Sequence, residues 1–326
     1  MLYASVLDLC PIVQGGTAAD SLRNSLDLAR HAERLGFRRY WVAEHHNLPS
    51  VASSATAVVI GHIAAGTQKI RVGAGGIMLP NHAPLLIAEQ FGTLESLFPG
   101  RIDLGLGRAP GSDGITQHAL RRDPQSAERF PEDVLELQAW FRQARPGQRV
   151  RAVPGAGLDI PIWILGSSLF GAQLAASLGL PYAFASHFAP AAMMQAISIY
   201  RERFEPSPSL DKPYVMLGVP VVAADTTAEA KRLHTSAQQS FLALRRGMPG
   251  PLPPPDETFS ERLEVVDRAL LADIMSLAVV GNLEETRAGL RAFAERTGAD
   301  ELMITAHIYD HAARVRSLEL TAEALQ

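Results

Sequence analysis

Short apolar runs alternate with stretches of helical periodicity along most of the chain. The first run, 3–9, is followed by apolar residues that recur at helical spacing from Leu22 to Ala32, and Gly36 then marks the end of the helix. Further runs of strand character occur at 38–43, 70–73, 102–106, 162–165, 182–185, 214–222 and 302–305, with helical patterns between them. The pattern therefore predicts eight strands that alternate with helices.

This alternation predicts an α/β fold, a (β/α)8 TIM barrel that forms a single domain over residues 1–326. A doubly wound open sheet is the competing architecture, although no GxGxxG follows the first strand. The connection between the seventh and eighth strands is longer than a barrel requires, and 247–255 is rich in proline and glycine. We interpret 247–262 as part of an insertion over the barrel mouth, either a mobile lid or a surface loop.

The composition narrows the class of protein. A hydrophobic share of 47% is enough for a large core and excludes wholesale disorder. The net charge of −4 argues against a nucleic-acid binder, and no apolar run reaches membrane-spanning length. Cys10 is the single cysteine, which excludes an intrachain disulfide, and the first residues lack a secretory signal pattern. We therefore expect a cytoplasmic protein without a membrane or nucleic-acid partner.

In a barrel of this kind, functional side chains gather where the strands end, at the C-terminal face. Five strand ends carry candidate groups: His45 and His46; Gly75 and Gly76; Arg108, framed by Gly107 and Gly111; Gly166, Ser167 and Ser168; and His187 with Phe188. Together they offer imidazoles, a wall without side chains, a cation that can make two parallel hydrogen bonds, and a helix N-terminus. This combination suits a planar cofactor that carries a phosphate.

These candidates also have purely structural explanations. Gly75 and Gly76 either allow a flat ligand to approach the backbone or form a bulge that the barrel's curvature requires. Ser167 and Ser168 either bind an anion at the start of a helix or simply cap that helix. Arg108 either grips a phosphate or lies on the surface. The residues alone leave these alternatives open.

The histidines suggest a second class of enzyme. His45, His46, His82, His187 and His307 would be the candidate ligands of a metal-dependent barrel hydrolase. However, neighbouring residues of an extended strand point to opposite faces, so His45 and His46 are poorly placed to share one ion. The first strand also lacks the HxH pair that would give two ligands on one face. We therefore predict no metal site.

Four segments resemble the luciferase-like flavin-dependent monooxygenase family. They are 35–46 (LGFRRYWVAEHH), 72–80 (VGAGGIMLP), 100–108 (GRIDLGLGR) and 165–168 (LGSS), and they occur in the family's order. The resemblance covers most of the chain. It implies a (β/α)8 barrel that binds reduced FMN at its C-terminal face.

The resemblance also implies roles for individual residues. His45 corresponds to the active-site histidine that supports the reaction of the reduced flavin with O2. The Gly75–Gly76 pair matches the position of a cis peptide bond packed against the flavin ring. The segment 247–262 falls where light-emitting relatives have a mobile active-site loop. Arg108 corresponds to the arginine that grips the flavin phosphate, and Gly166, Ser167 and Ser168 line the same phosphate.

The chain departs from the light-emitting members at Gly107, where those carry a reactive cysteine. The resemblance is therefore to the non-luminescent branch. It implies a monooxygenase that uses O2 and reduced FMN on an unidentified small organic substrate. From their position at the end of the sixth strand, His187 and Phe188 are the candidates for the substrate pocket. A separate reductase would supply the reduced FMN, because no NAD(P)H-binding fingerprint is present. Hydride transfer with the deazaflavin F420 and a non-catalytic flavin-binding protein are the alternatives, and we expect a homodimer.

Overall fold

The computed structural model describes residues 2–109, 113–123 and 125–326. Within this part of the chain, eight parallel strands close into a barrel in the order β1-β2-β3-β4-β5-β6-β7-β9, with β9 paired back to β1. The barrel strands are β1 (Tyr3–Asp8), β2 (Arg39–Val42), β3 (Arg71–Met78), β4 (Ile102–Gly107), β5 (Ile162–Gly166), β6 (Tyr182–Phe184), β7 (Val215–Ala223) and β9 (Glu301–Thr305). The predicted (β/α)8 barrel is therefore confirmed.

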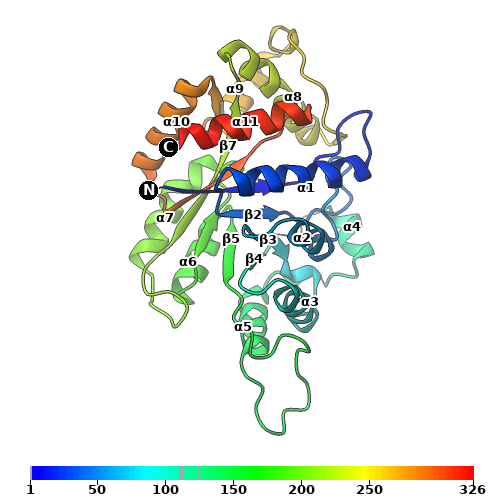
Figure 1. The fold of residues 1–326 in the computed structure, drawn as a ribbon, viewed down its shortest axis with the longest axis vertical. Coiled ribbons are helices and arrows are strands. Elements are labelled where there is room, and N and C mark those ends of the chain that lie inside the picture. Colours follow the sequence, from blue (N-terminus) through cyan, green and yellow to red (C-terminus); the bar gives the residue numbers. More distant parts are fainter. Residues whose placement is uncertain (1, 110–112, 124) are drawn as a thin grey trace.

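Helices surround the barrel, as Figure 1 shows. The helices between barrel strands include α1 (Ala18–Arg34), α2 (Thr56–Ala65), α3 (Pro84–Leu97), α5 (Phe130–Phe141), α6 (Leu169–Ser177), α7 (Met193–Glu202) and α10 (Leu283–Thr297), and α11 (His311–Ala324) follows the last strand. Their ends follow the local sequence: Thr17 and Asp20 form a capping box at the start of α1, and Gly36 takes a φ of 84° just beyond its end. Three 3-10 turns lie at Leu79–Asn81, Pro190–Ala192 and Phe259–Glu261. No helix in the described ranges combines the length and apolarity that a bilayer crossing needs.

The connection between β7 and β9 contains more structure than the sequence pattern predicts. It holds the helices α8 (Thr227–Arg245) and α9 (Val265–Ile274) and the strand β8 (Val279–Gly281), which pairs only with the end of β7. We refer to 224–278 as the insertion. Its helices lie at the top of Figure 1. A short helix, α4 (Gly114–Ala119), lies in the connection between β4 and α5.

The apolar core of the described residues has three clusters. The largest packs the helices against the outside of the barrel. The smallest packs α8 against the end of β7 and consists of Val222, Ala224, Ala230, Leu233 and Ile308. The remaining one lies inside the barrel and consists of Leu7, Trp41, Ala43, Trp163, Ala183, Met216 and Met303. This inner cluster matters for function because most of its side chains also line a cavity at the C-terminal ends of the strands.

Candidate active site

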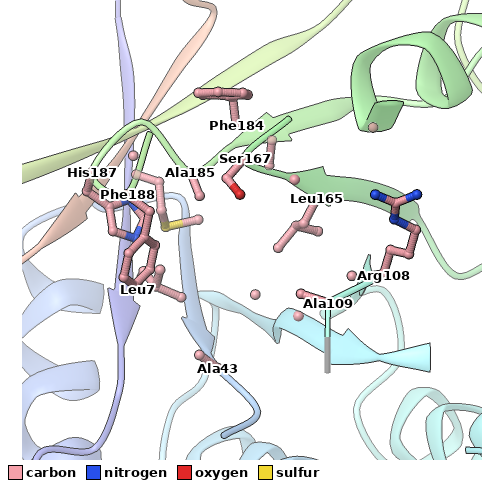
Figure 2. A pocket seen from close by; sticks show the side chains of 18 of the residues that line it. Leu7, Ala43, Arg108, Ala109, Leu165, Ser167, Phe184, Ala185, His187 and Phe188 are labelled. Carbon is pink, nitrogen blue, oxygen red and sulfur yellow. The ribbon is translucent and has the colours of Figure 1, made fainter. Parts of the chain in front are cut away.

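A cavity of about 380 Å³ opens at the C-terminal ends of the barrel strands. Figure 2 shows part of its lining, with Arg108 at one end and His187 and Phe188 at the other. Of the candidate residues at the five strand ends, His46 does not line this cavity, whereas the others that the structure describes do: His45, Gly75, Gly76, Gly107, Arg108, Gly166, Ser167, Ser168, His187 and Phe188. They come from the ends of five different strands, and only the barrel brings them together. Gly111, the other expected frame of Arg108, lies outside the described residues.

The Gly75–Gly76 wall is shaped by the barrel as well as by the cavity. Its peptide bond is cis, as the family resemblance implies. The register of β3 against β4 shifts between Ala74 and Ile77, so the expected bulge is present. A Cβ atom at Gly76 would come within 2.7 Å of the Gly105 carbonyl oxygen. Glycine is therefore required here by packing inside the barrel, and the same backbone forms a smooth wall of the cavity.

Arg108 is an exposed cation at one end of the cavity. Its guanidinium carbon lies 4.0 Å from the centroid of the Phe170 ring, which holds the side chain by a cation–π contact. It makes no ion pair with any residue that the structure describes. A guanidinium without a carboxylate partner, facing a cavity, is suited to bind an anionic group of a ligand.

The start of α6 forms the neighbouring part of the wall. Ser168 is the N-cap residue, with extended backbone, but its hydroxyl makes no capping hydrogen bond to the helix. Ser168 thus occupies the N-cap position, as the structural alternative expects, but its hydroxyl is not used to cap the helix. Ser167 is exposed, and it lines the cavity together with Gly166 and Arg108. Uncapped amides, serine hydroxyls and a cation are thus gathered at one end of the cavity, which is the chemistry of a phosphate site.

Glu44 is a functional candidate that the sequence did not single out. Its carboxylate is 1% exposed and accepts hydrogen bonds from the Met78 backbone N–H (2.9 Å), the Asn81 amide (3.0 Å) and the rings of His46 (2.9 Å) and His82 (3.0 Å). Burial alone would raise the pKa of the Glu44 carboxyl, but the hydrogen bonds from His46 and His82 lower it to about 2. The carboxylate therefore ties the His45 segment to the end of β3, next to the Gly75–Gly76 wall.

Replacing Glu44 with glutamine is expected to lower the free energy of unfolding by about 1–3 kcal/mol, because a buried set of donors loses its charged acceptor. The wild-type carboxylate has a lowered pKa, so its contribution is present above its ordinary pKa and is lost as the pH falls from about 4.5 toward about 2. The variant should lack this part of the acid dependence. Urea unfolding between pH 3 and 7 measures both effects, and the exposed Glu205→Gln is the matched control. Equal losses in the two variants would contradict the assigned role.

The structure places four of the candidate metal-ligand histidines in two different settings. His46 and His82 share the Glu44 carboxylate, whereas His45 and His187 line the cavity. Among the described residues, no three His, Cys, Asp or Glu side chains are grouped so that they could hold a metal ion. The five candidate ligands therefore do not converge on one point.

A second cavity, of about 680 Å³, adjoins the first. The two share Leu9, His45, His187 and Phe188 as a common wall. The insertion supplies another wall, which comprises His234, Ala237, Ser240, Phe241, Leu244, Gly247, Pro249, Leu252, Ile274 and Met275. Sequence reasoning missed this chamber, although positions 234, 237, 241 and 244 recur at helical spacing.

The proline-rich segment 247–262 contributes to this second cavity. Gly247, Pro249 and Leu252 line it, and Leu252 is buried. The Leu252 N–H donates to the Ile12 carbonyl (2.8 Å), and the Gln14 N–H donates to the Leu252 carbonyl (2.8 Å). The segment is thus attached to the loop after β1 at the barrel mouth, and its movement stays a prediction.

A family model described as luciferase-like monooxygenase matches residues 5–301. The chain belongs to the luciferase-like monooxygenase family. A luciferase-like monooxygenase of Escherichia coli K12 is 51% identical over 320 residues, which cover 98% of this chain and 96% of the relative. The uncharacterized protein YvbT of Bacillus subtilis is 56% identical over 98% of this chain and 95% of its own length.

Other luciferase-like proteins are similar over less sequence or at lower identity. An N-acetyl-S-alkylcysteine monooxygenase of Bacillus subtilis is 41% identical over 57% of each chain. The crystal structure of apo-MsnO8 matches with a TM-score of 0.88 and 36% identity, over 100% of this chain and 98% of the other. Two structures below 25% identity share the fold alone. The FMN complex of the oxygenating constituent of 3,6-diketocamphane monooxygenase from Pseudomonas putida has a TM-score of 0.74 (19% identity; 99% and 98% covered), and an F420-dependent secondary alcohol dehydrogenase has one of 0.73 (14%; 100% and 99%).

Proposed function

We propose that this luciferase-like protein is an FMN-dependent monooxygenase that binds FMN in the first cavity and its organic substrate in the second. One observation carries the proposal: the residues that match the family's flavin site line a cavity that shares a wall with a second, mainly apolar one. The relatives named as monooxygenases support the same reaction class.

The first cavity fits FMN at both of its ends. The phosphate would bind Arg108, the Ser167 and Ser168 hydroxyls and the start of α6, where no described side chain already neutralises the charge. The ring would lie against the Gly75–Gly76 backbone and the apolar side chains beneath it. The volume of the cavity falls in the range typical of small-molecule sites.

Reduced FMN, when bound, would supply the electrons that activate O2. The residues of this chain would do the rest. His45 would donate a hydrogen bond at the wall shared by the two cavities, close to the place where oxygen must pass to the substrate. The apolar lining of both cavities would limit the access of water to the reaction. A separate reductase would provide the reduced cofactor.

Titration with FMN and F420 tests the choice of cofactor, and His45→Ala tests the role of the imidazole. FMN is expected to bind and F420 to bind weakly. With reduced FMN and O2 but no substrate, His45→Ala should release H2O2 about tenfold faster than wild type, because a hydrogen bond worth ~1.5 kcal/mol is lost. Peroxide assays after rapid mixing provide the measurement, and His62→Ala, an exposed histidine of α2, is the control. An unchanged rate of H2O2 release in His45→Ala would contradict the role of His45. Tighter binding of F420 than of FMN would contradict the choice of cofactor.

A further inference from the structure

The second cavity has an unusual balance of charge. Among the described residues that line it there is no lysine and no arginine, and Asp113 is the only carboxylate. Asp113 is already engaged at the cavity edge: it accepts a hydrogen bond from the Thr116 N–H (2.8 Å) and another from the Asn47 amide (3.3 Å). An anionic ligand would therefore enter this chamber without a fixed counter-ion.

Three of the imidazoles that line the chamber, those of His187, His234 and His307, do not supply that counter-ion at neutral pH. Burial, followed by the nearby His307 and His45 rings, lowers the pKa of His187 to about 3. Burial also lowers the pKa of His234 and of His307 to about 4. All three rings are thus neutral near pH 7, where they act as hydrogen-bonding groups and not as cations.

His234 is the buried ring that the insertion places in this chamber, and Ser240 of the same helix also lines it. It is 7% exposed, and its Nδ1 atom is buried without a hydrogen-bond partner among the described residues. It lies on the face of α8 that also carries Ala237, Ser240, Phe241 and Leu244, all of which line the cavity. A buried ring nitrogen without a partner is unfavourable in a folded protein unless a ligand or water satisfies it. Its surroundings are otherwise mainly apolar.

We propose that the second cavity selects an uncharged, largely apolar molecule whose single polar group hydrogen-bonds to His234, so that α8 of the insertion determines substrate specificity. This inference rests on the proposed function, since it takes the second cavity to be the substrate chamber. The polar group of the substrate is held by α8, and the apolar remainder extends toward the wall of His45, His187 and Phe188, where the FMN cavity begins.

The test uses two probes of equal chain length, the uncharged 1-octanol and the anionic octanoate. Each is titrated into the protein at pH 7.5, in the absence and in the presence of FMN. Calorimetric titration should show that wild type binds 1-octanol at least about tenfold more tightly than octanoate, because the carboxylate would be desolvated without a partner. His234→Leu should weaken 1-octanol binding about fivefold and leave FMN binding unchanged, because one hydrogen bond is lost outside the first cavity. His234→Asn, which keeps a polar atom near the Nδ1 position, should recover most of the affinity.

His62→Leu makes the same substitution at an exposed site and should bind both probes like wild type. Equal or tighter binding of octanoate by wild type would overturn the proposal, as would unchanged 1-octanol binding in His234→Leu. If His234→Leu fails to fold, the probe ratio of wild type and the affinity of His234→Asn still decide. If wild type did not bind FMN but still bound 1-octanol more tightly than octanoate, the proposed function would be refuted, and the inferred selectivity of the second cavity would stand.

Discussion

Replacing Arg108 with alanine is expected to weaken FMN binding about 10- to 150-fold, the range that corresponds to losing ~1.5–3 kcal/mol of charge-assisted hydrogen bonding. The effect should be large because Arg108 has no ion-pair partner in the described chain and stacks on Phe170, so its guanidinium is already oriented in the free protein. The remaining groups at that end, Ser167, Ser168 and the start of α6, are polar but carry no full charge.

Riboflavin makes this prediction specific, because it has the same ring system as FMN without the phosphate. Wild type and Arg108→Ala should bind riboflavin with equal affinity, and only FMN should discriminate between them. Fluorescence titration gives both constants, and Arg203→Ala, an exposed arginine outside both cavities, is the control. If Arg108→Ala lost riboflavin and FMN affinity to the same extent, the guanidinium would be shaping the cavity and not binding the phosphate.

The barrel and the first cavity could be predicted from the sequence because their signals are local. Each barrel strand is a short apolar run, and the site residues lie at the end of such a run or soon after it, as Arg108 follows β4 and Ser167 follows β5. Parallel strands place their C-terminal ends on one face, so strand position alone indicates which residues meet. The motifs then indicate a flavin.

The second cavity could not be predicted in this way, because its walls come from segments with no shared pattern. Leu9, Asp113, His234 and His307 are distant in sequence and belong to no common motif. The strand β8 has only three residues, too few to show an alternation, and α8 carries polar residues on more than one face. Glu44 was missed for a similar reason: its partners Met78, Asn81 and His82 are more than thirty positions away.

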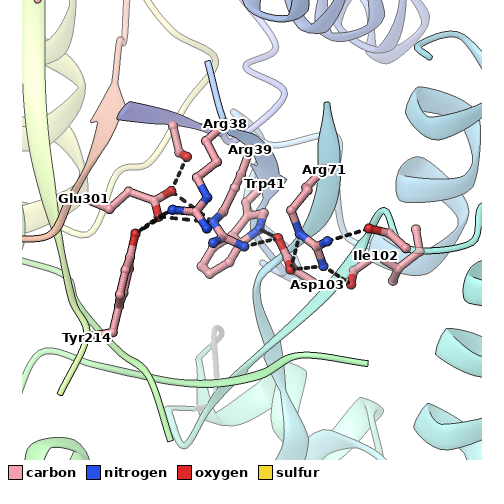
Figure 3. Close-up of polar contacts among 10 residues, drawn as sticks. Arg38, Arg39, Trp41, Arg71, Ile102, Asp103, Tyr214 and Glu301 are labelled. Carbon is pink, nitrogen blue, oxygen red and sulfur yellow. Dashed lines mark hydrogen bonds and ion pairs between the residues drawn. The ribbon is translucent and has the colours of Figure 1, made fainter. Parts of the chain in front are cut away.

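Figure 3 shows a buried ion network at the N-terminal end of the barrel. The apolar pattern of the sequence could not predict this network either. Arg39 donates to Asp103 (2.8 Å) and to Glu301 (3.0 Å), and all three side chains are buried inside the barrel. Other side chains also donate to these two carboxylates: Arg71 to Asp103 (2.7 Å), Trp41 to Asp103 (3.1 Å), Tyr214 to Glu301 (2.8 Å) and Ser5 to Glu301. Trp41 links this network to the floor of the first cavity, which it also lines.

Replacing Arg39 with leucine is expected to lower the free energy of unfolding by about 3–5 kcal/mol, because Asp103 and Glu301 then remain buried with a large part of their compensating charge removed. Burial by itself would lower the pKa of Arg39, but the two carboxylates raise it above its ordinary value, so the guanidinium is charged at every pH at which the protein is folded. The loss should therefore be nearly independent of pH in the neutral range.

Urea unfolding with tryptophan fluorescence measures this loss, and Arg23→Leu provides the comparison. Arg23 pairs with Asp20 on the exposed surface of α1, where solvent screens the pair and it contributes little to stability. The difference between the two variants isolates the effect of burial, since each removes one arginine from one or more carboxylates. A loss in Arg39→Leu no larger than that in Arg23→Leu would mean that Arg71 and the Trp41 and Tyr214 donors already compensate the two carboxylates. The barrel floor would then be held by hydrogen bonds that survive without its central cation.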